Sequence, residues 1–279
     1  MKRITIASFI FMALVYLFPI YSVSGQEKQV DRLVVPLSDP NERCTVDVGL
    51  VNGGISVTGY DGKDVIVEAK TRMKQLDPQD SKKSKGMIRI PVTTTGLTVE
   101  EEDNYVDVSV HSWKRTIDVT LKVPHKSSLE LSCVNHGDIY VEDVTGEFDI
   151  NNINGSVTLK DISGAVVAHA LNKDLIVTMK KVDSDKNMSF STLNGDVDVT
   201  FPKNVKAEVQ LNTTNGEIFS DFEVKISDKP KRIISDNEDG NKGKYRVEID
   251  RTIYGEINGG GAEMIFKSFN GNIYIRKQN

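Results

Sequence analysis

One short motif recurs along the chain and constrains the fold more than any other feature. Each copy opens with Asn, usually followed by Gly, and continues with two apolar residues separated by one other residue. Asn and Gly tolerate a positive φ, so the pair supplies a sharp corner, and the alternation that follows places one set of side chains inward. The copies begin at Asn52, Asn135, Asn154, Asn172, Asn194, Asn215 and Asn270.

The spacing of the motif indicates a stack of similar units. From Asn135 to Asn215 successive copies begin 19, 18, 22 and 21 residues apart, and a second turn falls between some of them, at 143–146 and 161–164. One unit is therefore turn, strand, turn, strand. A strand this short cannot bury its apolar face alone, so each unit is expected to stack on the next. We predict an all-β fold, a single-stranded parallel β-helix or solenoid with rungs of about 18–22 residues.

Two questions stay open at this point. Asn-Gly turns also join antiparallel strands in hairpins, so an antiparallel sandwich or barrel is the alternative fold. The same strand-turn-strand pattern in each unit favours parallel stacking. The repeated Asn residues either stack on one another as a ladder or each fit only their own turn.

The N-terminus is typical of an exported protein. Lys2 and Arg3 precede an apolar run over 4–20, and small residues follow that run. This order predicts a secretory signal peptide over 1–25 and one β-solenoid domain over 26–279, located in the periplasm, outside the cell or at its surface, with no membrane span after cleavage. An uncleaved anchor is the alternative, because the run is near the minimum of about 17 residues for a membrane span.

Three segments depart from the repeat. Residues 71–86 and 226–243 are charged and polar, so we predict loop insertions, which are the best candidates for variable contact loops on a rigid scaffold. Three consecutive glycines at 259–261 predict a tight bend or the close approach of another backbone.

The two cysteines are expected to be free thiols. An exported protein can form a disulfide. However, Cys44 lies eight residues before a corner Asn and Cys133 two residues before one. They therefore occupy different positions in the repeat.

Charge and motifs exclude several classes of function. The net charge is −5, acidic and basic residues are interspersed, and no basic stripe of the kind that binds nucleic acid is present. The four histidines lack metal-ligand spacing, and neither a nucleophile elbow nor a phosphate-binding loop occurs. We therefore predict no catalytic, cofactor-binding or metal-binding residue and no enzymatic activity.

Carboxylate and aromatic side chains are the remaining candidates for functional residues. Asp138 with Asp196, or Asp143 with Asp161, could form a glycosidase-type pair if neighbouring units bring them together. An Asp beside a turn normally caps its own backbone, and we favour that interpretation. Exposed aromatic rings stack on sugars, so the possible ligand-contact residues are Trp113, Tyr140 and Tyr274.

One stretch of the chain resembles a known family. From about 117 to 219 a strand is followed by Val123-Pro124, by the segment 127–131 and then by Asn-Gly units joined through short glycine turns. This order resembles an adhesin-like, β-strand-repeat family of exported bacterial proteins, a domain of unknown function. The resemblance implies a parallel β-helix with an adhesin-like role. Long regular faces of stacked strands suit extended partners, so we predict a binding or scaffold protein of the cell envelope, with a glycan or an envelope protein as partner. The alternative is a carbohydrate-active enzyme of the β-helix type, a polysaccharide lyase or glycosidase.

Overall fold

The structure is a computed structural model that describes residues 30–72, 85–87, 94–112, 114–227, 232–235, 246–249 and 251–279. Every regular element in these ranges is a β-strand, which confirms the prediction of an all-β fold. No helix suited to crossing a membrane occurs within them. The predicted signal peptide, Trp113 and most of the two predicted insertions lie outside the described residues.

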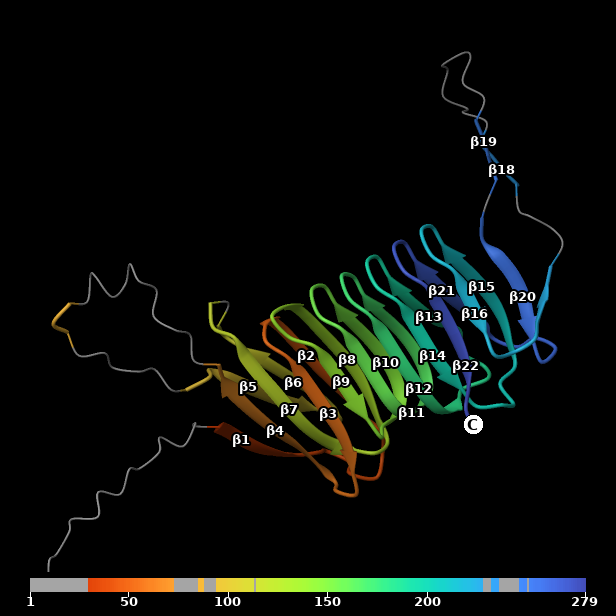
Figure 1. The fold of residues 1–279 in the computed structure, drawn as a ribbon. Helices are drawn as coiled ribbons and strands as arrows, with labels where there is room; N and C mark the ends of the chain where they lie inside the picture. Colours follow the sequence, from red (N-terminus) through yellow and green to blue (C-terminus); the bar gives the residue numbers. More distant parts are fainter. Residues whose placement is uncertain are drawn as a thin grey trace, which may run out of the picture.

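The strands form two rows that face each other across the core (Figure 1). The first row consists, in spatial order, of β5 (Leu97–Glu102), β6 (Tyr105–Val110), β2 (Cys44–Asn52), β8 (Ser127–Asn135), β10 (Thr145–Asn152), the C-terminal half of β11 (Val157–Ala170), β13 (Met188–Thr192), β21 (Glu263–Ser268), β15 (Ala207–Thr213), β20 (Ile253–Ile257) and β17 (Val224–Ile226).

The second row lies opposite. It consists of β1 (Val30–Pro36), β4 (Asp64–Thr71), β7 (Ile117–Pro124), β3 (Ile55–Tyr60), β9 (Ile139–Glu142), the N-terminal half of β11, β12 (Leu175–Val182), β14 (Val197–Phe201), β22 (Ile273–Lys277) and β16 (Ile218–Ser220). Strand β11 passes from the second row into the first and joins them into one sheet. A separate antiparallel pair, β18 (Arg232–Ser235) and β19 (Arg246–Ile249), follows β17.

The strand pairing is mixed, so the finer prediction of a single-stranded parallel β-helix holds only in part. Pairs in the middle of each row are parallel, whereas β1, β4 and β5 at one end and β17 and β20 at the other pair antiparallel. At the N-terminal end of the first row, the antiparallel strand β5 is joined to β6 by a short turn. Asp103 and Asn104 link β5 to β6, and both have positive φ (51° and 63°), as a two-residue hairpin turn requires.

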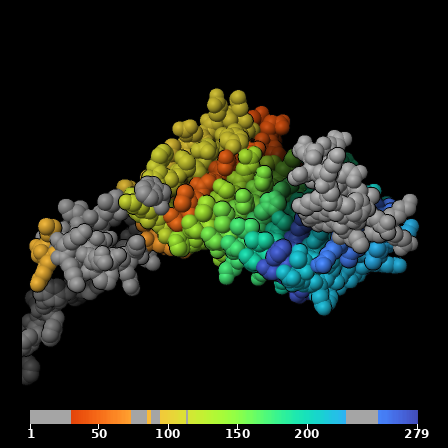
Figure 2. Space-filling view, turned by 90° about the horizontal axis from the view of Figure 1, so that it is seen from above, coloured from red at the N-terminus to blue at the C-terminus, as the bar shows by residue number. Residues whose placement is uncertain are grey.

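The stacking order differs from the predicted order at both ends. We call a first-row strand and the second-row strand that follows it a coil. The β2–β3 coil lies between the β6–β7 and β8–β9 coils, and the β21–β22 coil lies between the β13–β14 and β15–β16 coils (Figure 1). In Figure 2 the orange surface of the β2–β3 coil accordingly lies between yellow and green surface. All coils expose similar edges, and loop-closure entropy rises slowly with loop length, so a distant coil can occupy these places.

The core fills the space between the two rows. In β8, for example, Leu129, Leu131 and Cys133 are buried and alternate with residues that reach solvent. Near the C-terminal end, Phe190 of β13 stacks on Phe266 of β21 with ring centroids 5.1 Å apart. The β21–β22 coil is therefore part of the main core.

The corner asparagines form a ladder of side-chain hydrogen bonds, which confirms the ladder interpretation. Each amide nitrogen donates to the amide oxygen of the adjacent coil over 2.8–2.9 Å. The ladder runs through Asn135, Asn154, Asn172, Asn194, Asn270 and Asn215. Its order follows the spatial order of the coils, because Asn270 joins Asn194 to Asn215.

Candidate binding surface

An apolar ridge runs beside the Asn ladder. It consists of the residues that precede the corner asparagines, namely Val51, Val134, Ile153, Leu171, Leu193 and Phe269. Four of these side chains are 40–49% exposed, and the other two are half-buried.

The ridge is continuous because the coils are in register. Leu193 N donates to Leu171 O over 3.0 Å, and the neighbouring corners are joined by similar backbone bonds. Paired strands lie about 4.8 Å apart, so adjacent ridge residues lie side by side. The result is a stripe that is one side chain wide and extends over several coils.

Buried polar side chains hold the corners beneath the ridge. Thr192 Oγ1 donates to Lys173 O over 3.0 Å, Ser268 Oγ to Gly195 O over 3.1 Å, and Asn152 Nδ2 to Gly137 O over 3.1 Å. Each bond joins a side chain of one coil to a corner carbonyl of the adjacent coil, which fixes neighbouring corners relative to each other.

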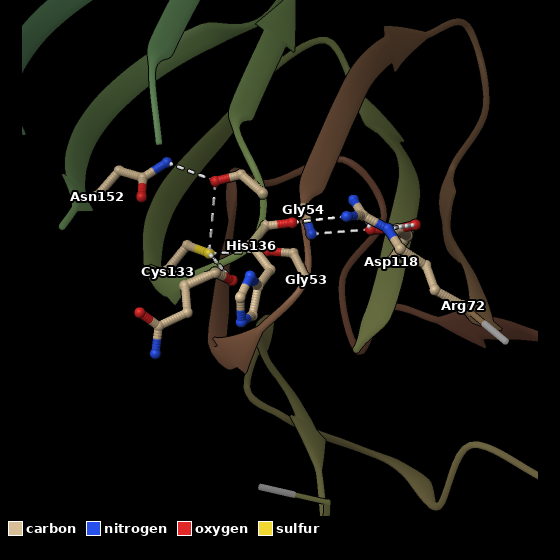
Figure 3. Close-up of polar contacts among 9 residues, drawn as sticks. Gly53, Gly54, Arg72, Asp118, Cys133, His136 and Asn152 are labelled. Carbon is tan, nitrogen blue, oxygen red and sulfur yellow. Dashed lines mark hydrogen bonds and ion pairs between the residues drawn. The ribbon is translucent and has the colours of Figure 1, made fainter. Parts of the chain in front are cut away.

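The Cys133 thiol performs the same task as these polar groups. It donates to Gly53 O over 2.8 Å (Figure 3). The Cys44 thiol instead contacts Ser127 Oγ at 3.1 Å. Both cysteines are buried and free, which confirms the prediction of two thiols. Burial raises the pKa of both thiols, so neither is a reactive thiolate.

An ion pair fixes the corner nearest the N-terminal end of the ridge. Arg72 binds Asp118 through two nitrogens at 2.6 and 2.7 Å and donates from Nη1 to His136 O at 2.6 Å (Figure 3). Asp118 also accepts the backbone N–H of Gly54. The hydrogen bonds to Asp118 raise the pKa of Arg72, and the fork geometry orients three different coils.

The ladder amides retain capacity for a ligand. An amide has two N–H donors and an oxygen with two lone pairs. In the described part of the chain, Asn154 and Asn172 each use one donor and one lone pair for the ladder. One donor and one acceptor site per corner therefore remain for solvent or a partner, beside the apolar ridge.

The residues on the first-row side of the ridge are mostly uncharged. The outward positions next to it are Ser132, Asn151, His169, Ser191, Lys267 and Asn212. Ridge, ladder and this flanking row together form a long surface with little charge.

The carboxylates on the other side of the ladder are structural. Asp138 accepts the N–H of Ser156 at 2.8 Å, and Asp196 accepts the N–H of Asn272 at 2.7 Å. The coils that carry Ser156 and Asp174 separate these two carboxylates. The idea that neighbouring coils bring Asp138 and Asp196 together is therefore wrong.

Asp143 and Asp161 occupy equivalent turns with positive φ, one coil apart. Asp143 forms an ion pair with Lys180 at 2.7 Å, and this contact lowers the pKa of Asp143. A glycosidase acid needs a raised pKa, so the environment of Asp143 does not suit that role. Among the residues that the structure describes, no group of His, Cys, Asp and Glu side chains has the geometry of a metal site.

The first row near the N-terminal end is strongly acidic. Its outward carboxylates lie side by side on adjacent strands, in the order Glu100, Asp107, Asp47, Glu130 and Asp149. None of them forms an ion pair within the described ranges. Burial, followed by the charges of Asp47 and Glu100, raises the pKa of Asp107. Burial and a hydrogen bond to Asp47 raise the pKa of Tyr105 to about 12.

Tyr140 and Tyr274 lie in one outward line on the second row, but the structure does not bring them together. Three intervening strands, with Thr158, Ile176 and Asp198 at the same position, separate them. The Tyr140 hydroxyl donates to Glu142. The Tyr274 ring stacks on Phe219 with centroids 5.3 Å apart, and Arg276 lies 5.0 Å above it. A ligand-contact role for both tyrosines stays a prediction.

Sequence reasoning missed the apolar ridge. The signal lies one residue before the Asn-Gly motif, where Val, Ile, Leu or Phe precedes nearly every corner Asn. An apolar residue at a turn is unexpected, and its repetition marks a surface feature.

Stacked coils with Asn corners define an all-β repeat protein of the β-strand-repeat class. The family model described as Toastrack DUF4097 matches residues 44–258, and the chain belongs to that family. This result confirms the resemblance to a β-strand-repeat family of unknown function. No curated protein matches the sequence.

Two crystal structures have similar coordinates. One is a protein of Clostridium sporogenes ATCC 15579, provisionally described as a cell adhesion protein, with 9% identity, a TM-score of 0.44 and coverage of 90% of this chain and 100% of that chain. The other is a provisional adhesin of Bacteroides fragilis NCTC 9343, with 11% identity, a TM-score of 0.39 and coverage of 90% and 98%.

Proposed function

We propose that this protein is an exported, non-enzymatic binding protein of the bacterial cell envelope, adhesin-like in action, with a rigid β-solenoid scaffold. Its binding surface is the apolar ridge with the adjoining Asn ladder, and its partner is an extended, uncharged glycan. The N-terminal charge and apolar pattern supports export, with residues 1–25 as the signal peptide.

The exposed apolar ridge is the observation that carries this proposal. Soluble proteins seldom expose a continuous apolar stripe without using it for binding. The ridge is only one side chain wide, whereas a stable protein partner covers about 800 Å² on each side. A linear chain molecule fits this shape better than a globular partner does.

The neighbouring amides support a glycan in particular. Sugar rings present apolar C–H faces beside hydroxyl groups, and the ridge and ladder present apolar groups beside uncharged donors and acceptors. The corner bonds and the ladder hold these groups rigidly, which lowers the entropic cost of binding.

The experiment compares two pairs of substitutions in the chain 26–279. Leu171→Ser with Leu193→Ser removes two ridge side chains that are 41% and 40% exposed. Val34→Ser with Ile176→Ser removes two side chains of similar exposure, 51% and 44%, from the second row. Binding is measured on an array of neutral envelope polysaccharides, and circular dichroism checks that each variant is folded.

We expect the ridge variant to bind at least about tenfold more weakly than the parent and the control variant to bind normally. Equal binding by the ridge variant and the parent would contradict the proposed surface. Cleavage of any tested polysaccharide by the parent would contradict the non-enzymatic function.

A further inference from the structure

The C-terminal coil occupies a slot between two coils that follow each other directly in the chain. Strand β14 ends at Phe201 and β15 begins at Ala207, so the connection 202–206 passes from one side of the inserted β21–β22 coil to the other. The slot is filled by a segment that begins more than forty residues after β15 ends.

The C-terminal coil is held by side-chain and backbone contacts to both walls of the slot. Asn270 donates to Asn194 and accepts from Asn215, each at 2.8 Å. Arg276 binds Asp198 through two hydrogen bonds, and Phe266 stacks on Phe190. An identical coil from another copy of the chain has the same side chains and the same register, so it can make the same contacts.

The two walls of the slot are themselves in register. Phe190 pairs through Phe266 with Leu211 in the first row, and Val197 pairs through Ile273 with Ile218 in the second row. Both offsets between the walls equal 21 residues (211 − 190 and 218 − 197). The two walls therefore keep the same register in both rows, and a coil that fills the slot needs no shift in strand register.

The loop that leads into the C-terminal coil is a short, tight hinge whose conformation depends on glycine. Strand β20 pairs with one edge of β15 and β21 with the other edge, so residues 258–262 must cross the start of β15. Asn258, Gly259 and Gly260 all have positive φ (51°, 86° and 81°). A Cβ on Gly261 would lie 2.6 Å from Lys206 O, which shows how closely the loop crosses that backbone.

We propose that the β21–β22 coil is an exchangeable element and that the slot accepts the same coil from a second copy of this chain. Two copies that exchange their C-terminal coils form a symmetric dimer in which every slot contact is kept. The closed hinge loses its three consecutive positive φ values when it extends between the copies. A short hinge that crosses another strand closely favours this kind of exchange.

The experiment uses a disulfide trap across the slot in the chain 26–279. Ser189 and Ile265 are paired in β13 and β21, and parallel neighbours of this kind lie within the Cα distance that a disulfide spans. The Ser189→Cys, Ile265→Cys variant therefore joins wall and coil within one chain in the monomer and between two chains in the exchanged dimer. The single Ser189→Cys variant controls for pairing with the two native thiols.

The matched control is Val167→Cys with Ser189→Cys, because this pair joins β11 to β13 and does not include the exchanged coil. After refolding at increasing protein concentration and oxidation, non-reducing electrophoresis separates the two products. We expect covalent dimers in the wall-to-coil variant, in amounts that rise with concentration, and only monomers in the control.

Variants of the hinge loop test whether its closed conformation controls the exchange of the coil. Gly259→Pro with Gly260→Pro cannot adopt the closed hinge, because proline fixes φ near −65°, and should raise the ratio of dimer to monomer at least about tenfold. Insertion of a Gly-Ser segment between Gly260 and Gly261 relieves the crossing and should lower that ratio. Covalent monomers alone in the parent hinge and in both hinge variants, at every concentration, would overturn the proposal.

Discussion

The middle and the ends of the stack are built from the same motif but assembled differently. From 127 to 201 the order of the coils in space equals their order in the chain. At each end a coil from a distant part of the chain is inserted between two others. The motif therefore specifies how a coil pairs with its neighbour. It does not specify which coil of the chain that neighbour is.

The largest expected effect concerns the core. Phe148 of a middle coil is 2% exposed and Phe266 of the inserted C-terminal coil is fully buried. Replacement of either by Ala should cost about 3–5 kcal/mol of unfolding free energy, since a large cavity forms. Urea denaturation measures this cost.

The two variants should differ in where the molecule opens. Hydrogen exchange over 263–277 should rise strongly in Phe266→Ala, because this coil can leave the slot while the remainder stays folded. In Phe148→Ala the same segment should exchange no faster than the other coils. Equal hydrogen-exchange protection of 263–277 in both variants would show that the inserted coil does not open independently of the middle coils.

A smaller effect is expected for the Asn ladder. Asn154→Ala in the middle and Asn270→Ala in the inserted coil each remove two ladder bonds, whereas Asn215→Ala at the end removes one. A net hydrogen bond contributes about 0.5–1.5 kcal/mol, so the first two variants should each lose about twice as much stability as the third.

Thermal unfolding of the three variants tests the ladder directly. Similar losses for Asn154→Ala and Asn270→Ala would show that an inserted coil is bound as firmly at its corner as a middle coil. Equal losses in all three variants would mean that each Asn stabilises only its own turn.

Residues with a local role were predictable from sequence. The corners at Asn154 and Asn194, the alternation of each strand and the free thiols of Cys44 and Cys133 follow from turn chemistry and from position in the repeat. The all-β class follows for the same reason, because the local signals all agree.

The insertion of β2–β3 and β21–β22 was not predictable in this way. Sequence distance enters the folding free energy only through loop closure, which grows slowly with length, so periodicity cannot rank near and distant neighbours. The antiparallel ends were missed because β1 and β20 lie outside the recurring motif. The wide separation of Asp138 and Asp196 is also a matter of spatial order, which the repeat spacing alone does not specify.

The smallest expected effect arises where the inserted N-terminal coil meets its neighbours. Strand β2 places Asp47 between Asp107 and Glu130, so three carboxylates of three different coils lie side by side. Like charges on adjacent strands destabilise a sheet by about 0.2–1 kcal/mol, and salt screens the effect. Asp107→Asn should therefore raise the stability at neutral pH by a few tenths of a kcal/mol, and Asp149→Asn, with one carboxylate neighbour, should raise it less.

The sign of the pH dependence follows from the raised pKa of Asp107. An acid with a higher pKa in the folded state than in the unfolded state binds its proton more tightly when folded, so the parent loses stability as the pH rises from the ordinary aspartate range through the raised pKa. Asp107→Asn lacks this loss, and its advantage should be present at neutral pH and absent at strongly acidic pH. Urea unfolding at both pH values, at low and high salt, measures the difference. An advantage that persists at acidic pH would have to come from packing, and the inserted coil would then carry no electrostatic strain relative to the middle coils.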